Sequence, residues 1–306
     1  MQTANVTDEF TDDFDGNGVV EKPRVMLASF WRVIEVPNLI ALDAPIVAIC
    51  WQYWLSVTLS EKPKPLIHLL LFLTVWLVYI ADRLLDCRRL DFQLDVPLRH
   101  QFANKWGWVL WPIWCGAFVF NGLLAILFVD SFLVIAGAIL FSVVLFYGWV
   151  VHGRPTTGQW LPKEFFVAGL FSLGVCLPIF VSKNTLSTLV LTALLSWLFL
   201  LNCFCVAAAQ RKSDQLQNIG SAIRLFPSLC SRIPLLAFLL VAAAMIANHA
   251  DIVSYPITLA ISISSVGLML LSYAIDRAND WSKKTRYGLL ADSALLSPLV
   301  VLVLYR

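Results

Sequence analysis

The sequence predicts an all-α polytopic membrane protein with nine transmembrane helices. Of its 306 residues, 59% are hydrophobic, and the mean hydropathy is +0.77, whereas soluble domains hold about 45–50% apolar residues. The apolar residues fall in runs of about 20, the length that a helix needs to cross the hydrocarbon core of a bilayer. The alternating segments of about ten residues that are typical of membrane β-barrels are not found in the sequence.

Charged and turn-forming residues separate the apolar runs in chain order. The connections after runs one, three, five and seven are short and contain Pro, Asp, Asn or Ser. Gly and Pro in 152–162 end the fourth run, and long polar connections follow runs two, six and eight. Such residues commonly terminate helices. The runs are 39–59, 66–85, 108–129, 132–151, 165–181, 186–209, 233–247, 252–275 and 287–305.

The residues outside the runs predict the domain organisation and the topology. The first 24 residues contain six acidic and two basic side chains, so we expect 1–28 to be a disordered acidic cytoplasmic tail and 29–306 to be the membrane domain. With the N-terminus inside, 18 of the 22 Lys and Arg residues face the cytoplasm, as the positive-inside rule requires. We expect an integral protein of a bacterial inner (cytoplasmic) membrane whose active face is cytoplasmic.

An acidic pair ends the second run, in Tyr79-Ile-Ala-Asp82-Arg83-Leu-Leu-Asp86. On a helix the two carboxylates share one face, where they repel each other and oppose the helix dipole. A carboxylate in hydrocarbon costs about 2.5–3.5 kcal/mol or more. A cation should therefore offset the pair. It is either a divalent metal ion that itself holds a phosphate or a salt-bridging Arg83, Arg88 or Arg89.

Further acids occur late in the chain. Tyr273-Ala-Ile-Asp276-Arg277-Ala-Asn-Asp280 repeats the pattern Tyr-x-x-Asp-Arg-x-x-Asp after the eighth run. The repeat is either coincidence, since helix ends at a membrane surface favour these residues, or part of a paired site. Asp292 lies inside the ninth run. An acid within a membrane is a functional candidate by default, and a structural pair with Arg286 is the alternative.

The layout resembles the UbiA superfamily of membrane prenyltransferases. The resemblance rests on nine helices with the N-terminus inside, on Asp82-x-x-x-Asp86 at the cytoplasmic end of the second helix, and on the long polar loop after it. Tyr147, at the end of the fourth run, and Arg154 and Lys163, before the fifth, add to it. In this family, Asp-rich motifs after the second and sixth helices bind Mg²⁺ and the diphosphate of an isoprenoid donor.

The resemblance implies an activity and a site. The expected activity is Mg²⁺-dependent transfer of a prenyl group from a prenyl diphosphate to a lipid-soluble acceptor. Mg²⁺ and basic side chains would stabilise the charge that develops on the diphosphate as the carbon–oxygen bond breaks. The expected metal ligands are Asp82, Asp86 and Asp214. The expected diphosphate-binding residues are Arg88, Arg89, Arg211 and Lys212, and the weaker acidic candidates are Asp276, Asp280 and Asp292.

The motifs also depart from the family pattern, and other functions stay open. Val78 stands where the first motif usually has Asn, and the second motif keeps one acid, Asp214. Each basic candidate can alternatively serve only as a topology signal. Beside the enzyme, a non-catalytic UbiA-like protein that binds a lipid or isoprenoid is possible, as is a transporter that uses Asp43 and Asp292. A transporter usually carries its acids near the midplane. No basic segment suggests a nucleic-acid partner.

Overall fold

The computed structural model describes residues 36–61, 64–94, 96–153, 163–183, 185–278 and 281–305. Within these ranges the chain is helical apart from its connections and contains no β-strand. The predicted tail, 1–28, lies outside the described residues. The helices are α2 (Asp43–Thr58), α3 (Pro65–Asp86), α4 (Leu98–Phe128), α5 (Ser131–Gly153), α6 (Lys163–Ser182), α7 (Leu186–Leu216), α8 (Ala222–Leu225), α9 (Leu229–His249), α10 (Tyr255–Arg277), α11 (Trp281–Ala294) and α12 (Ser297–Leu304).

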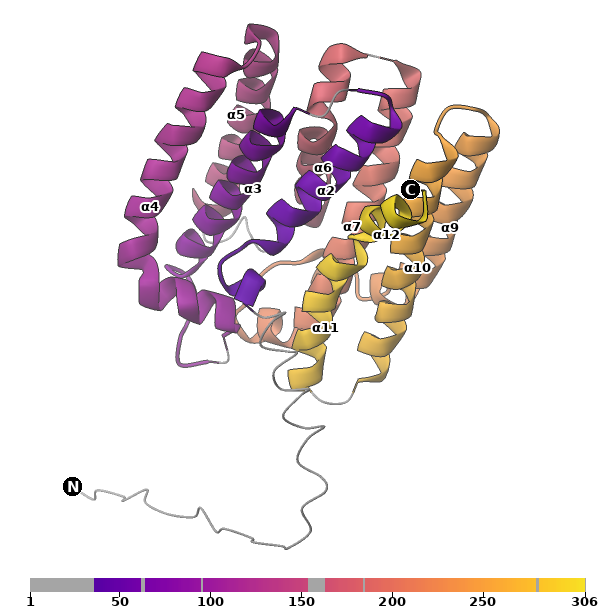
Figure 1. Ribbon diagram of the computed structural model, residues 1–306. Helices are drawn as coiled ribbons and strands as arrows, with labels where there is room; N and C mark the ends of the chain where they lie inside the picture. Colours follow the sequence, from indigo (N-terminus) through magenta and orange to yellow (C-terminus); the bar gives the residue numbers. More distant parts are fainter. Residues whose placement is uncertain are drawn as a thin grey trace, which may run out of the picture.

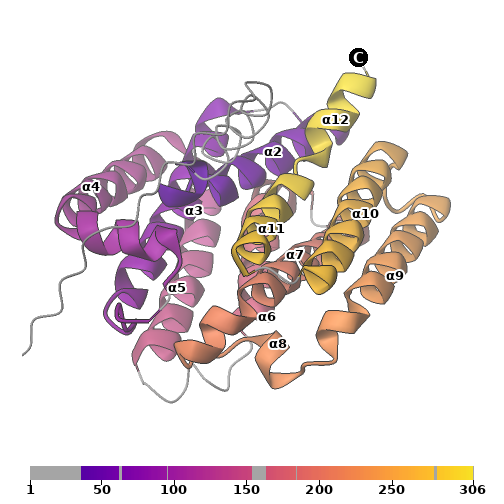
Figure 2. The ribbon, with the colours of Figure 1, turned by 90° about the horizontal axis from the view of Figure 1, so that it is seen from below.

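Helix α7 is the centre of the bundle. It packs against α6, α9, α10 and α11, and its side chains Leu195, Leu198 and Leu201 are fully buried. Figure 2 shows α3, α4 and α5 on one side of α7, and α9 and α10 on the other. The long helices run roughly parallel to a common axis (Figure 1), so the loops and helix ends gather at the two ends of the bundle.

Helices α4 and α5 form an apolar outer face. None of residues 131–151 is buried inside the protein, and Trp108, Ile126 and Trp149 expose 76%, 71% and 68% of their surface. Soluble monomers rarely expose apolar patches of this extent. The α4–α5 face therefore matches contact with lipid tails, as the hydropathy of the sequence predicts.

Eight helical segments in the described part of the chain are long and apolar enough to cross a membrane, one fewer than predicted. The difference is the first predicted span, 39–59, because only Asp43–Thr58 forms the continuous helix α2. Sixteen residues rise about 24 Å, short of the roughly 30 Å hydrocarbon core. A single helical turn at 36–39 precedes α2, and Ala41 between them has φ +57°. The chain thus bends where one straight span is predicted.

The ninth predicted span is also interrupted, between α11 and α12. Pro298, in the first turn of α12, has no N–H, and its ring crowds the carbonyl four residues earlier, that of Ala294. Ser264 Oγ donates a hydrogen bond to this carbonyl at 2.8 Å, and Trp51 Nε1 donates to the Leu295 carbonyl at 2.9 Å. Because backbone groups in a membrane need partners within the protein, α10 and α2 stabilise the break.

Two helices extend well beyond their apolar runs, at the same end of the bundle. Helix α4 begins at Leu98 instead of 108, and α7 continues to Leu216 instead of 209. The connection predicted at 210–232 thus contains the last turns of α7, the short α8 and the first turn of α9. These polar helical turns carry several of the residues described below.

Candidate functional site

The acidic pair of the first motif lies on the last turns of α3. Asp82 is exposed and Asp86 is half-buried. Helices α3, α5 and α7 end, and α4 and α6 begin, at this end of the bundle (Figure 1). Asp82 and Asp86 are therefore close to four other helix ends, as their position in the sequence predicts.

Lys163, the first residue of α6, is the basic group among the acids. Its ammonium interacts electrostatically with Asp86, Asp82 and Asp214, in decreasing order. The same neighbourhood holds Glu164, which also acts on Lys163. Asp214 lies on the last turns of α7, so the structure brings acids from the two motifs, about 130 residues apart in sequence, around a single cation.

Arg99 and His100 tie α4 to this region, which the sequence did not predict. Arg99 Nη2 donates to Gln210 Oε1 of α7 at 3.0 Å, and its Nε donates to His100 Nε2 at 3.3 Å. Arg99 also acts on Asp214. His100 falls in the polar connection that the sequence predicts after the second run, but it is buried in the first turn of α4. The signal that could have revealed both residues is Pro97, which is well suited to precede the first turn of a helix.

Cys87 links the end of α3 to the same turn of α4. Its thiol donates to the His100 carbonyl at 3.4 Å. Burial, with the charge of Asp86 beside it, raises the pKa of the Cys87 thiol to about 11. The thiol is therefore uncharged at neutral pH and acts as a hydrogen-bond donor, so it adds no charge to the acids around Lys163.

Glu164 and Tyr147 complete the surroundings of Lys163. Glu164 is buried, and its Oε1 accepts a hydrogen bond from the backbone N–H of Ala222, at the start of α8, at 2.8 Å. This bond holds the connection after α7 against α6. Tyr147 of α5 stacks on Phe166, with 5.4 Å between ring centroids, and acts on the same acids, Asp82 first. Tyr147 and Lys163 are two of the three residues that added to the family resemblance; the third, Arg154, lies outside the described residues.

The predicted diphosphate-binding residues are distributed around the helix ends. Arg88 is exposed and lies 5.9 Å from the centre of the Trp111 ring. Arg89 donates to the Val151 carbonyl at the end of α5 at 2.9 Å. Arg211 is half-buried on α7, and Lys212 beside it is exposed. The cations that act most strongly on Asp214 are instead Lys163 and Arg99.

Arg83 has partners outside its own helix that the sequence did not predict. Its guanidinium is buried and donates to the carbonyls of Asn38 and Leu39, the second at 3.1 Å. Its Nη2 lies 3.9 Å from Asp43 Oδ1. Arg83 thus joins α3 to the bend that precedes α2. Asp82, on the same helix, also interacts electrostatically with Arg83.

The second copy of the pattern lies apart from the Lys163 cluster. Asp276 is exposed at the end of α10, as is Arg277, whereas Arg83 of the first copy is buried. Asp276 is not among the groups that act on Lys163. Asp280 lies outside the described residues. The shared sequence therefore does not give the two arginines a shared environment.

Asp292 forms a polar contact inside the bundle. Asn202 Nδ2 of α7 donates to Asp292 Oδ1 at 2.8 Å, which matches the helix–helix hydrogen bond that polar residues in membranes commonly make. Asp43 at the start of α2 is a second hydrogen-bond partner of the Asp292 carboxyl group. Arg286, the partner considered in the sequence, is not among the largest influences on the Asp292 carboxyl group.

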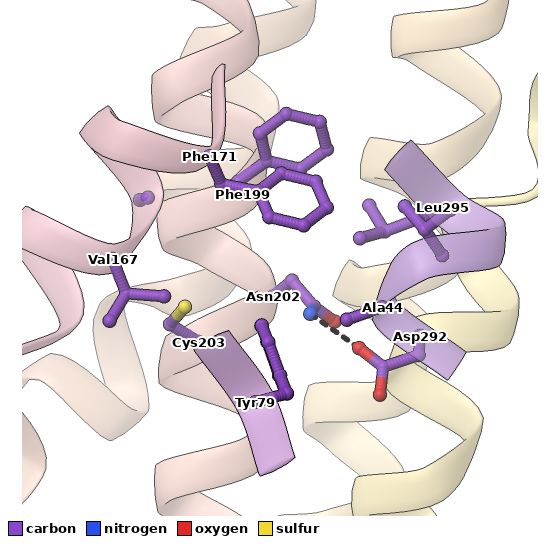
Figure 3. A pocket seen from close by; sticks show the side chains of 11 residues that line it. Ala44, Tyr79, Val167, Phe171, Phe199, Asn202, Cys203, Asp292 and Leu295 are labelled. Atoms are coloured by element: carbon purple, nitrogen blue, oxygen red, sulfur yellow. Dashed lines mark hydrogen bonds between the residues drawn. The ribbon is translucent and has the colours of Figure 1, made fainter. Parts of the chain in front are cut away.

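A narrow cavity adjoins this contact, between α2, α3, α6, α7 and α11 (Figure 3). Its polar side is formed by Asn202 and Asp292, with Tyr79 beside them, and the Phe171 and Phe199 rings form an apolar wall. The empty space among the lining side chains is about 290 Å³, a volume that includes open solvent at the mouth of the cavity. The part of this space in which the centre of a water molecule fits is only about 20 Å³. The cavity thus has room for about one water-sized group.

The acids around Lys163 suit a metal site that water and phosphate oxygens complete, and they do not suit a site in which protein side chains supply every ligand. Within the described residues, no three His, Cys, Asp or Glu side chains lie close enough to share one metal ion. Mg²⁺ typically takes one or two protein carboxylates and completes its shell with water and phosphate oxygens. The pair Asp82 and Asp86, on one helix face, supplies donors of this kind.

The helical arrangement defines a class of membrane protein. The chain has an all-α, polytopic membrane fold like that of a solved membrane protein. The solved structure that supports this is digeranylgeranylglyceryl phosphate synthase in membranes: it aligns with a TM-score of 0.53 at 14% identity, over 90% of this chain and 97% of that one. At this identity the likeness concerns the fold. No protein-family model matches the chain, and no curated protein matches it in sequence.

Proposed function

We propose that the chain is a membrane-embedded prenyltransferase, which transfers a prenyl group from a prenyl diphosphate to a lipid-soluble acceptor. The observation that carries the proposal is the gathering of Asp82, Asp86 and Asp214 around Lys163 at one end of a UbiA-like bundle. Carboxylates beside a buried cation, next to an apolar interior, are suited to hold a metal–diphosphate whose prenyl chain extends into the membrane.

Each group at this end has a proposed role. Asp82 and Asp86 would hold Mg²⁺ from α3, and Asp214 would approach the same metal–diphosphate from α7. Bound Mg²⁺ would neutralise charge on the departing diphosphate. Lys163 and Arg99 are half-buried cations that interact with these acids, and they would bind diphosphate oxygens because charged donors form strong hydrogen bonds to phosphate. Arg88, Arg89, Arg211 and Lys212 would attract the anionic donor to the helix ends.

The chemistry at the reacting carbon explains why an apolar interior would be useful. As the carbon–oxygen bond breaks, the diphosphate takes the electron pair and the prenyl carbon becomes cation-like. The acceptor then supplies the electron pair for the new bond and loses a proton. Apolar helices exclude water from this carbon, so that the acceptor competes successfully with hydrolysis.

The narrow cavity supports a second candidate function. With room for about one water, this cavity accommodates part of a prenyl chain only if its lining side chains move. A non-catalytic protein that binds a lipid or isoprenoid through the same helix ends is therefore the alternative. Release of diphosphate distinguishes the two, because binding alone leaves the donor intact.

The experiment is an assay of diphosphate release from geranyl, farnesyl and geranylgeranyl diphosphates by the full-length protein in detergent, with Mg²⁺ or with a chelator. The proposal expects Mg²⁺-dependent release that Asp82→Asn abolishes. Asp276→Asn is the matched control, because Asp276 ends another helix, α10, at the same end of the bundle and is exposed. Intact donors at all chain lengths, in the presence of measurable donor binding, would instead support the non-catalytic alternative.

A further inference from the structure

Two acids that the proposed transferase does not use meet inside the bundle. Asp43 is the first residue of α2, directly after the bend that interrupts the first predicted span. Asp292 lies in α11, two residues before Ala294, where the ninth predicted span is interrupted. The two side chains are hydrogen-bonded to each other, and Figure 3 shows Asp292 beside Ala44, the next residue of α2. The contact therefore joins the two interrupted spans.

A hydrogen bond between two carboxyl groups requires a proton on one of them, because an ionised carboxylate has only acceptors. Without that proton, two negative charges would face each other away from bulk water, where like charges repel strongly. The contact between α2 and α11 therefore depends on one bound proton.

The donors around Asp43 identify it as the ionised member of the pair. Asn38 Nδ2 donates to Asp43 Oδ2 at 2.6 Å, and the Ala44 N–H donates to Oδ1 at 3.1 Å. The Arg83 guanidinium lies 3.9 Å from the same Oδ1. Hydrogen bonds and a nearby cation both favour the charged form of a carboxyl group, so Asp43 and Arg83 balance each other's charge.

The surroundings of Asp292 give less support to a negative charge. Asn202 Nδ2 donates to Asp292 Oδ1 at 2.8 Å. Arg99 also acts on Asp292, but its guanidinium donates to Gln210 and acts on Asp214 as well. One amide donor and a shared guanidinium stabilise a carboxylate less than the donors around the other acid do. The proton therefore belongs on Asp292, which donates it to the acid of α2.

Tyr79 of α3 is the other hydroxyl-bearing neighbour of the pair. It lines the cavity with Asp292, and its phenol interacts electrostatically with Asp292 and Asp43. Asp82, one helical turn further along α3, acts on the same phenol and adds negative charge on this side. An ionised Asp292 that accepts a hydrogen bond from the Tyr79 hydroxyl is the alternative to a protonated Asp292.

The described parts of the other helices around the pair add little net charge. Helix α6 lines the cavity with apolar side chains and begins with Lys163 and Glu164, which act on Cys203 of the cavity lining. Their opposite charges largely cancel at a distance. Helices α10 and α12 meet the α11–α12 break with Ser264 and Ser297, which hydrogen-bond to each other and are uncharged.

We propose that Asp292 carries a proton at neutral pH and that this proton fastens α11 to α2, as a pH-sensitive switch inside the bundle. When the proton leaves, the two carboxylates repel each other and the hydrogen bond between the helices is lost. The α11–α12 break keeps the hydrogen bonds from Trp51 and Ser264, while the cavity between α2 and α11 widens. The inference does not depend on the proposed transferase activity, because no substrate takes part in it.

Infrared spectroscopy of the full-length protein in detergent detects the proton directly. The carbonyl stretch of a protonated carboxyl group lies apart from the bands of carboxylates and backbone amides. We expect this band at neutral pH and its reversible loss as the pH is raised. Asp292→Asn should remove the component that titrates. Asp276→Asn, at an exposed acid, and Tyr79→Phe should leave it in place. Asp43→Asn should keep the band but shift it, because the acceptor changes from a carboxylate to an amide.

Melting curves at a series of pH values test the mechanical consequence. In the folded protein Asp292 holds a proton that an aspartate in the unfolded chain releases at neutral pH, so stability falls as the pH rises. The melting temperature of the wild type and of Asp276→Asn should therefore fall between mildly acidic and mildly alkaline pH. In Asp292→Asn most of this fall should be absent, because the amide donates in place of the proton and does not titrate.

Several results would overturn the inference. Absence of the band from the wild type at neutral pH would show an ionised Asp292, held by Tyr79 and Arg99. A band that Asp292→Asn leaves intact, or an equal pH dependence of melting in all three proteins, would also contradict it. If Asp292→Asn does not fold, the titration of the wild-type band and Asp43→Asn make the test, since loss of the band in Asp43→Asn would place the proton on Asp43.

Discussion

Replacement of Arg83 by Met tests the interpretation of the buried end of α3. Arg83 is 5% exposed, and its guanidinium donates to two backbone carbonyls and lies 3.9 Å from the Asp43 carboxylate. Met fills much of the same space but leaves these acceptors without their donor. Removal of one partner from a buried ionic group costs about 3–5 kcal/mol. We therefore expect a clear loss of stability without a large change in packed volume.

The assay is unfolding of the purified protein in mixed detergent micelles with increasing SDS, followed by circular dichroism. Arg88→Met is the control, because Arg88 is exposed and its contact is with the Trp111 ring at 5.9 Å. Such a contact contributes about 0.5–1 kcal/mol at exposed sites. Equal losses in Arg83→Met and Arg88→Met would refute the assignment of Arg83 as the residue that fixes the bend before α2.

Two further predictions concern topology and the interrupted helix. In a cysteine-free background, a thiol reagent that does not cross membranes should label Ser60→Cys from outside, and should label Gln215→Cys only after permeabilisation. The reason is that most basic residues lie on the same side of the membrane as Gln215, which the positive-inside rule places in the cytoplasm. External labelling of Gln215→Cys would contradict the topology. Trp51→Phe should destabilise the protein by about 1–3 kcal/mol, since it leaves the Leu295 carbonyl without its donor. A melting temperature unchanged from the wild type would show that the α11–α12 break does not depend on this bond.

The class of fold could be predicted because a bilayer imposes few solutions on an apolar chain. Runs of about 20 apolar residues must form helices, since unpaired backbone groups are too costly in hydrocarbon. The helix ends could not be predicted as well, because hydropathy detects only the part of a helix that contacts lipid. The polar turns that begin α4 at Leu98 and end α7 at Leu216 read as loops. For this reason the burial of His100, in the first turn of α4, could not be predicted.

The acidic candidates show the same limit for the site. Asp82 and Asp86 could be singled out because their cost in a membrane-spanning helix requires compensation. The interactions of these acids with Lys163 and Arg99 could not be predicted, because the two basic residues come from other helices and meet the acids only in the folded bundle. The two copies of Tyr-x-x-Asp-Arg-x-x-Asp demonstrate this most directly: Arg83 is buried and Arg277 is exposed, so local sequence alone does not determine the environment.

The central claim is that the acids at the end of α3 hold Mg²⁺ together with a diphosphate. Melting curves in detergent, with and without Mg²⁺ and inorganic diphosphate, test it directly for the wild type, Asp82→Asn and Asp276→Asn. A ligand at 100 times its Kd stabilises the folded protein by about 2.7 kcal/mol. We expect the wild type and Asp276→Asn to gain stability and Asp82→Asn to lose most of the gain. No Mg²⁺-dependent gain in the wild type, or an equal gain in all three proteins, would contradict the claim.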